Sequence, residues 1–453
     1  MTTLVPESPV ELRTNSTEMQ SPPFDYYLFA ATFVLAAGGI AMVFDTTYPQ
    51  VGSGALLAQS QAYFAVKQAI GVVAGFGAMA FFARLPIARL MQFVRPAALI
   101  AWVALLFVFV PHIGHTVNDA ARWVGPAGAE FQPAECAKLI MLLFVVSEVC
   151  NPEPKRGRWV YAYIGIPVLA NELLICLLKR QVNAFGVVLM VASVGLLVLA
   201  RMVQQPIRPG TKQAVPTLPR IAIALTAVVI CLRLIEQEPD LGTAAVLLAA
   251  VYCVLVAARV AWRTLAMVAL VTVIAFASAT VGYTHRRSRI ETWLHPSANA
   301  SGDGYQVWQS VRAVGSGYIF GRGVGLGLGK YFIPQADTDF AFATIGEELG
   351  LCGSVALLAL FGLVIFRGMI IAERAGNLRS QLLAVGITSL IGWQAIINIG
   401  VATDTIPNTG VPMPFLSFGL TTLITTMAGI GILLRIGLES PRSKLAVGAP
   451  VKP

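Results

Sequence analysis

Charged residues are scarce in this chain. Only 12% of its 453 residues are Asp, Glu, Lys or Arg, whereas 56% are hydrophobic, and the mean hydropathy is +0.73. A soluble protein carries about 25% charged residues, so this chain has too few charges to cover a water-exposed surface. The scarcity excludes soluble enzymes, nucleic-acid-binding proteins and disordered proteins. It fits a polytopic helical membrane protein, whose outer surface is covered by lipid.

Cysteine and histidine are also few, and neither forms a metal-binding pattern. The six cysteines lie in or beside apolar runs, and we expect them to be small core residues without disulfides. They are Cys136, Cys150, Cys176, Cys231, Cys253 and Cys352. The four histidines lie between apolar runs with no coherent ligand spacing, so we interpret them as solvated. They are His112, His115, His285 and His295.

Long apolar runs make up most of the chain. Twelve are long enough to predict membrane-spanning helices, and their length disfavours a β-barrel, whose strands would alternate in short segments. The twelve lie near 26–44, 63–84, 96–111, 133–150, 159–178, 184–202, 219–236, 242–259, 262–283, 349–372, 381–401 and 413–436. The prediction is an all-α transmembrane bundle over 26–437, between a proline-containing disordered tail at 1–25 and a second tail at 438–453.

Basic residues set the expected orientation. Lys and Arg gather in alternate loops, at 84–95, 155–158, 201–220, 259–263 and 367–379, which therefore face the cytoplasm. Both termini then lie inside, and the net charge of +9 reflects topology rather than nucleic-acid binding. Lys179 and Arg180 are the main exception. One outer segment, 284–342, is long, and we expect it to fold back on the membrane surface with amphipathic pieces such as Tyr305–Val314.

Two stretches of the sequence echo each other. Ile175-Cys176 precedes a polar break and an apolar run that ends at Arg201, and Ile230-Cys231 precedes a similar break and a run that ends at Arg259. The echo indicates either a duplicated helical hairpin or the ordinary likeness of two apolar hairpins. The two copies would have parallel orientation.

Two charged residues open the predicted span at 133–150. Glu135 and Lys138 are three positions apart and share one helix face, where they can pair. Ionisable groups in a span are costly and often functional. The pair is therefore either a structural ion pair or part of a charged cavity near the outer surface.

Three aspartates lie where predicted spans meet the outer side. Asp240 precedes the span at 242–259, and we interpret it as the N-cap of that helix, with a proton relay as the alternative. Asp337 and Asp339 close the long outer segment, where partial burial would suit a general base; the alternatives are a helix N-cap and a solvated loop. Arg286, Arg287 and Arg289 begin that segment and can serve as an interfacial anchor or bind phosphate.

Several short motifs occur together in a characteristic order. The chain therefore resembles the SEDS proteins (shape, elongation, division and sporulation), the FtsW/RodA group, over nearly all of its length after residue 26. The motifs are Ala121-Arg122-Trp123-Val124-Gly125, Phe131-Gln132-Pro133-Ala134-Glu135, Glu238-Pro239-Asp240-Leu241-Gly242-Thr243, Gly304-Tyr305-Gln306 with Gln309-Ser310, Gly315-Ser316-Gly317, Gly321 to Gly329, Thr338-Asp339-Phe340, Gly346 to Gly350, and Pro407-Asn408-Thr409-Gly410 with Pro412 to Gly419.

The resemblance implies a peptidoglycan glycosyltransferase of the bacterial cytoplasmic membrane. It would polymerise lipid II, an undecaprenyl-pyrophosphate-linked disaccharide-pentapeptide, at the outer face, together with a class B penicillin-binding transpeptidase. The family's essential carboxylate maps onto Asp339, which is the predicted catalytic residue. The predicted substrate-binding residues are Arg122, Glu135, Lys138, Gln306, Gln309 and Lys330.

The chain also departs from the family pattern. The family usually has about ten spans, so twelve imply one added hairpin. Asp337 stands where the family commonly has histidine, and we predict that it either contributes to binding a divalent cation such as Mg²⁺ or Mn²⁺ or raises the pKa of Asp339. Two alternative functions stay open. One is a lipid II flippase or other transporter, for which Glu172 and Arg233 are further ionisable candidates; the other is an inactive scaffold that recruits a transpeptidase.

Overall fold

The computed structural model describes residues 24–47, 61–110, 113–117, 120–125, 130–151, 171, 218–281, 284–295 and 304–440. Helices dominate these ranges, and one β-hairpin joins them. The elements are α1 (Tyr26–Thr46), α3 (Gln61–Arg84), α4 (Ile87–Phe107), β1 (Gly114–Val117), β2 (Ala120–Val124), α5 (Pro133–Val149), α8 (Leu218–Gln237), α9 (Leu241–Ala257), α10 (Trp262–Val281), α11 (Thr284–Leu294), α12 (Tyr305–Ser316), the 3₁₀ helix η1 (Gly329–Tyr331), α13 (Ala341–Arg374), α14 (Leu378–Ala402) and α15 (Leu420–Glu439).

Seven helices in the described ranges are long and apolar enough to cross a membrane: α1, α3, α4, α10, α13, α14 and α15. The apolar helix α9 is shorter. Helices α5 and α8 coincide with two further predicted spans, but α5 has only 17 residues and α8 carries three charged side chains. The predicted spans 159–178 and 184–202, and with them Glu172, Lys179, Arg180 and the first copy of the echo, lie outside the described residues. The all-α membrane fold is confirmed, and the total of twelve stays a prediction.

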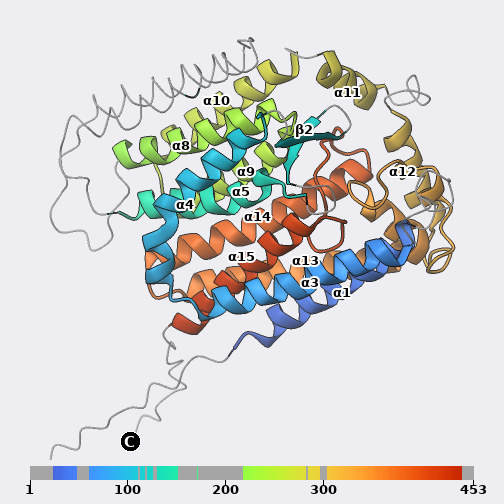
Figure 1. Cartoon of the computed structure of the whole chain (residues 1–453), viewed down its shortest axis with the longest axis horizontal. Helices are drawn as coiled ribbons and strands as arrows, with labels where there is room; N and C mark the ends of the chain where they lie inside the picture. The colour runs from blue at the N-terminus through green and yellow to red at the C-terminus, as the bar shows by residue number, and fades with distance from the viewer. Residues whose placement is uncertain are drawn as a thin grey trace, which may run out of the picture.

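The helices lie side by side along the long axis of the molecule (Figure 1). Helix α14 is central, with 72% of its most apolar stretch buried inside the protein, whereas α10 is peripheral at 11%. Small residues allow close approach between helices, as is usual in membranes. A side-chain carbon on Gly431 of α15, for example, would lie 2.4 Å from the Met79 backbone oxygen of α3.

Polar contacts tie helix ends together at one end of the bundle. The Asp25 carboxylate, which caps α1, accepts hydrogen bonds of 2.8 to 3.1 Å from Arg367 of α13. The Ile87 amide at the start of α4 donates to Glu439 at the end of α15, over 3.2 Å. The hairpin β1–β2, α11 and α12 gather at the opposite end (Figure 1). This grouping matches the predicted alternation of spans; which end faces outward stays a prediction.

Three local expectations were refined. Helix α4 starts at Ile87, before the predicted start at 96, because Pro86 precedes its first turn and the helix accommodates Pro96 internally. The segment 284–342 contains α11, α12 and η1, and α12 covers the predicted amphipathic piece. The expectation that all cysteines are core residues is wrong for Cys352, which is exposed on α13, where lipid offers an apolar thiol the same advantage as a core.

Candidate active site

The turn that carries Asp339 is fixed by its own backbone and by two other segments. The amides of Thr338 and Asp339 both donate to the Gln335 oxygen over 3.1 Å, which closes the turn just before α13. The Asn398 amide of α14 donates 2.9 Å to the Asp339 carbonyl. Ser417 adds a hydrogen bond from its hydroxyl to the Thr338 carbonyl. Asp339 is thus held in place by α14 and by the segment before α15.

Arg122 of β2 lies beside Asp339. Its guanidinium donates to the backbone oxygens of Glu238 and Pro239, over 3.0 and 2.6 Å, which anchors the hairpin to the start of α9. A side-chain carbon on Gly410 would lie 3.5 Å from Asp339 Oδ2 and 3.9 Å from Arg122 Nη1. Gly410 adopts φ +69, which favours glycine. The Asp339 carboxylate and the Arg122 guanidinium therefore both lie next to Gly410.

A second arginine reaches the same region from α11. Arg289 Nη1 donates 3.3 Å to the Asn408 carbonyl, two residues before Gly410. The Asn408 side chain in turn donates 3.3 Å to Gln306 of α12. The predicted residue Gln306 is therefore connected to this site, whereas Gln309 is half-buried one turn away on α12.

Burial governs the acidity of Asp339. The residue as a whole is half-buried, but protein groups surround its carboxyl, and this burial raises the pKa of Asp339 to about 6. Arg122 opposes the rise, Asp240 and Asp337 add to it by like-charge repulsion, and Arg289 opposes it more weakly. The carboxyl is therefore largely ionised at pH 7, but it is a better proton acceptor than an exposed aspartate.

Asp240 caps helix α9, as the sequence predicted. Its carboxylate accepts hydrogen bonds from the Thr243 amide and hydroxyl over 2.9 and 2.8 Å. Gln132, just before α5, adds a bond of 3.3 Å. The structural role is confirmed, and the proton-relay alternative stays a prediction.

Glu135 and Lys138 form a buried ion pair inside the bundle, 2.8 Å apart. The Lys138 ammonium also donates 3.1 Å to Gln394 of α14, whose amide donates 3.0 Å to the Pro412 carbonyl. The pair lines a cavity of about 30 Å³ between α5, α14 and α15, which is room for one water molecule. The predicted pairing is confirmed, and the polar chain through Gln394 extends from it toward the 407–418 segment.

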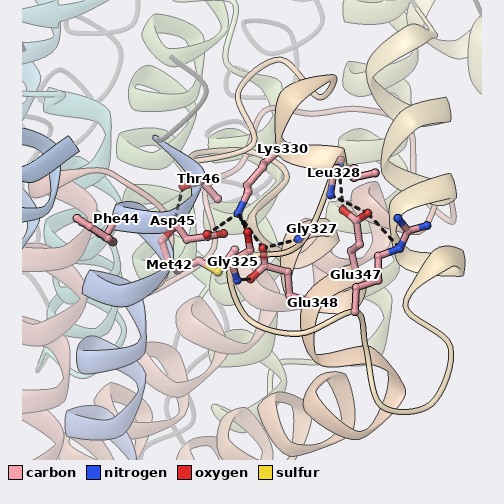
Figure 2. Close-up of polar contacts among 12 residues, drawn as sticks. Met42, Phe44, Asp45, Thr46, Gly325, Gly327, Leu328, Lys330, Glu347 and Glu348 are labelled. Atoms are coloured by element: carbon pink, nitrogen blue, oxygen red, sulfur yellow. Dashed lines mark hydrogen bonds and ion pairs between the residues drawn. The ribbon is translucent and has the colours of Figure 1, made fainter. Parts of the chain in front are cut away.

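Lys330 lies elsewhere. Its side chain is 2% exposed and pairs with Asp45 at the end of α1 and with Glu348 of α13, the latter at 3.0 Å (Figure 2). Burial lowers the pKa of Lys330, but its hydrogen bonds to Asp45 and Glu348 outweigh burial and hold the pKa above the usual value. The ammonium is paired within this cluster, apart from the Asp339 site. The predicted role of Lys330 in substrate binding stays a prediction.

The cation site predicted at Asp337 stays a prediction. Within the described ranges, no three side chains of His, Cys, Asp or Glu come close enough together to hold a metal ion. The backbone carbonyl of Asp337 accepts a hydrogen bond of 2.8 Å from the Phe418 amide. The negative charge of Asp337 raises the pKa of Asp339.

Several site residues escaped the sequence-based prediction. Gln394 and Asn398 are polar residues four positions apart in an apolar span, which is a signal for function in a membrane protein. Arg289 was one of three candidate arginines, and only the fold separates it from its neighbours. Arg287 is exposed and pairs with Glu291 at 3.0 Å, whereas Arg286 is buried against Glu236 at 2.8 Å.

Comparison with known proteins identifies the family of this chain. The FtsW/RodA/SpoVE cell cycle protein profile matches residues 26–208 and 196–441. The chain belongs to this family. Its curated relatives in the family include a probable peptidoglycan glycosyltransferase FtsW of Hahella chejuensis, 30% identical over 437 residues that span 94% of this chain and 93% of the relative. The stage V sporulation protein E of Bacillus subtilis is 28% identical, over 94% of this chain and 99% of that protein.

Solved structures agree with the fold. The rod shape determining protein RodA of Thermus thermophilus superposes with a TM-score of 0.57 at 22% identity, over 93% of this chain and 98% of that one. A chain of a solved peptidoglycan synthase complex, which is described as coordinating polymerization and crosslinking, gives a TM-score of 0.62 at 22% identity, over 91% and 97%. This family member is therefore a multi-pass membrane protein with a RodA-like fold.

Proposed function

We propose that this protein is a peptidoglycan glycosyltransferase that polymerises lipid II. The observation that carries the proposal is a carboxylate with a raised pKa, Asp339, flanked by Arg122 and approached by Arg289 at one end of a membrane bundle. The names of FtsW relatives that share nearly the whole chain support the same activity.

The arrangement suits glycosyl transfer from a lipid pyrophosphate. A sugar hydroxyl is a poor nucleophile, and Asp339 takes its proton as the oxygen attacks the anomeric carbon of the second substrate. The bond between that carbon and the pyrophosphate oxygen breaks, and the pyrophosphate leaves with the electron pair. Arg122 and Arg289 stabilise the developing negative charge.

The two lysines predicted from sequence are less suited to this role. Lys138 is paired with Glu135, and Lys330 is paired with both Asp45 and Glu348. A divalent cation bound with the help of Asp337 would supply further positive charge for the leaving pyrophosphate. We keep Gln306 as a substrate-binding residue because Asn408 connects it to Arg289.

We further propose a class B penicillin-binding transpeptidase as the partner. The structurally similar chain belongs to a peptidoglycan synthase complex that coordinates polymerization with crosslinking, and this supports the pairing. The transpeptidase therefore belongs in the assay.

The experiment is incubation of purified protein with labelled lipid II, with and without the transpeptidase. We expect glycan chains from the native protein and none from Asp339→Asn. Asp404→Asn, which removes a carboxylate just after α14, is the matched control and should leave polymerisation unchanged. Equal activity of native protein and Asp339→Asn contradicts the catalytic assignment.

The arginines need a separate comparison. Arg289→Gln should lower the polymerisation rate by about tenfold or more, because a charge-assisted contact to the leaving group is lost. Arg287→Gln, two residues away on the same helix and exposed, should have no effect. Native protein that polymerises nothing with any partner favours the flippase or the scaffold instead.

A further inference from the structure

The segment Tyr318–Phe332 contains a stretch in which glycine alternates with apolar residues. Gly325, Gly327 and Gly329 alternate with Val324, Leu326 and Leu328. A side-chain carbon on each of these three glycines would meet a carboxylate or its stem. The nearest atoms are Asp45 Oδ1 at 3.8 Å for Gly325, Glu348 Cγ and Oε1 at 2.8 Å for Gly327, and Glu347 Oε2 at 2.6 Å for Gly329. An added side-chain carbon would therefore point toward the carboxylates, and at Gly327 and Gly329 those carboxylates would have to shift to admit it.

The carboxylates also satisfy the backbone of this segment (Figure 2). Glu348 accepts hydrogen bonds from the amides of Gly325 and Gly327 over 2.9 and 3.1 Å. Glu347 accepts from the amides of Leu328 and Gly329 over 3.1 and 2.7 Å. An irregular segment can enter an apolar environment only when its backbone groups are paired, and these four backbone donors have partners.

A kink in α13 leaves backbone groups of this helix free to form hydrogen bonds with the first half of the segment. Gly350 interrupts the helix at φ +65, and the freed carbonyls of Glu347 and Glu348 accept from Arg322 and Gly323 over 3.0 Å each. In return, the amides of Leu351 and Cys352 donate to Tyr318 and Ile319 over 2.9 and 3.0 Å. The segment is thus joined to α13 beside the part of that helix that spans the membrane.

The outward side of the segment is apolar and exposed. Phe320 is 82% exposed, Val324 75% and Leu326 67%, and Tyr318, Ile319, Leu328, Tyr331 and Phe332 are also exposed. Of the two charges of the segment, Lys330 is buried, whereas the Arg322 side chain is 40% exposed and lies 3.7 Å from Glu347. A long arginine side chain can keep its charged end in the polar headgroup region while its stem lies along apolar surface. A contiguous apolar surface of this kind would be a liability in water.

The apolar surface continues along α13. Leu349, Leu351, Val355 and Leu358 are exposed on this helix, which is long and apolar enough to span the membrane. The kink joins them directly to Tyr318 and Ile319. The same lipid that covers α13 therefore borders the segment, and tyrosines are typical of that boundary.

We infer that Tyr318–Phe332 inserts into the lipid bilayer as an interfacial loop, with Val324, Leu326 and Leu328 among the acyl chains and the glycines against the protein. The bilayer is the occupant because the amides of Gly325, Gly327, Leu328 and Gly329 are paired, the most exposed side chains are mainly apolar and the segment is continuous with a membrane-spanning helix. Asp339 follows Phe332 closely along the chain, so the loop also fixes the depth of the site relative to the lipid. The inference does not depend on the reaction that the site performs.

The test uses the full chain, with its native cysteines replaced by alanine, reconstituted in vesicles of phosphatidylcholine and phosphatidylglycerol. A single cysteine is introduced by Leu326→Cys and labelled with an environment-sensitive fluorophore. The matched control is Glu291→Cys on the polar, exposed face of α11. Quenching by a nitroxide on the lipid acyl chain is compared with quenching by aqueous iodide.

We expect the label at 326 to emit at shorter wavelength than the label at 291, to lose most of its intensity with the acyl-chain nitroxide and to be shielded from iodide. Quenching of the label at 326 by iodide to the same extent as at 291 overturns the inference. Shielding from both quenchers also overturns it, because a protein surface would then cover the loop.

A second measurement uses the unmodified protein. Vesicles that contain a phospholipid with a photoreactive diazirine in its acyl chain are illuminated, and labelled peptides are identified by mass spectrometry. Adducts are expected within Tyr318–Phe332 as well as on α13. Adducts on α13 alone overturn the inference. This measurement uses the native chain, so it stays valid if the cysteine-free chain folds poorly.

Discussion

Asp339 combines two requirements that conflict in water. It has to be ionised to accept a proton and basic enough to hold it. Burial meets both by raising its pKa to about 6, while Arg122 and Arg289 prevent a larger rise. The active form is the ionised one, so the rate falls as protons are added.

The acid limb of the pH profile tests this balance. We expect polymerisation to fall below pH 6, by about tenfold per pH unit, as Asp339 becomes protonated. Asp337→Asn removes a like charge and should move the limb to lower pH, whereas Arg289→Gln should move it to higher pH. A pH profile of the initial polymerisation rate measures both. Shifts in the same direction for the two variants would contradict the assigned electrostatics.

The buried pair Glu135–Lys138 allows a prediction about stability. Removal of one partner leaves an uncompensated charge inside the bundle, so Lys138→Met should destabilise the protein by about 3 kcal/mol. The double variant Glu135→Gln, Lys138→Met should recover most of that loss. Thermal unfolding in detergent is the measurement, and a double variant less stable than Lys138→Met would contradict this interpretation.

At the scale of elements, the kink at Gly350 determines the contacts that helix α13 makes with the neighbouring loop. Gly350 takes a left-handed φ, and a side-chain carbon there would lie 2.3 Å from the Gly321 nitrogen. The helix turns at this point from the site toward the membrane span, and the Glu347 and Glu348 carbonyls are free to hold the neighbouring loop only because the helix breaks.

Gly350→Ala should therefore destabilise the protein by about 2 kcal/mol or more, through strain at positive φ and overpacking. Gly362→Ala is the matched control in the same helix, because nothing lies within 4 Å of the added carbon. It should leave the unfolding temperature unchanged or raise it. Equal losses for both would show that general glycine content, rather than the kink, matters.

Local contacts were the part of the structure that the sequence could predict. The spacing of Glu135 and Lys138 predicted their pairing, and the position of Asp240 before an apolar run predicted a helix cap. Contacts between distant segments left no such signal. Lys330 meets Asp45 across 285 positions, and Arg122 meets Glu238 across 116. Charge and composition alone could not distinguish a lysine at the site from one in a structural cluster.

At the scale of the whole molecule, α3 near the beginning of the chain packs closely against α15, the last described helix. Gly431 of α15 meets the Met79 backbone, and Gly75 of α3 faces the flexible Met427 side chain. The Met79 backbone, unlike the Met427 side chain, cannot move aside without shifting helix α3. It therefore sets how closely α3 and α15 approach.

Gly431→Ala should push the two helices apart and destabilise the bundle by about 1 to 3 kcal/mol. Gly77→Ala is the control on α3, since the added carbon would meet nothing within 4 Å. Thermal unfolding of both variants in lipid nanodiscs is the measurement. A stable Gly431→Ala protein with an unchanged unfolding temperature would contradict the close contact.

The pairing of α3 with α15 also has a consequence for the order of synthesis. Gln68 of α3 is buried and donates to the Ser417 carbonyl, 349 residues later. The ribosome releases α3 long before α15 exists. A chain that stops before Ser417 leaves the Gln68 amide without that acceptor, and the surface of α3 that α15 covers stays open. The surface of α3 that packs against α15 is therefore buried only after the C-terminal segment with Ser417 and α15 has been synthesised.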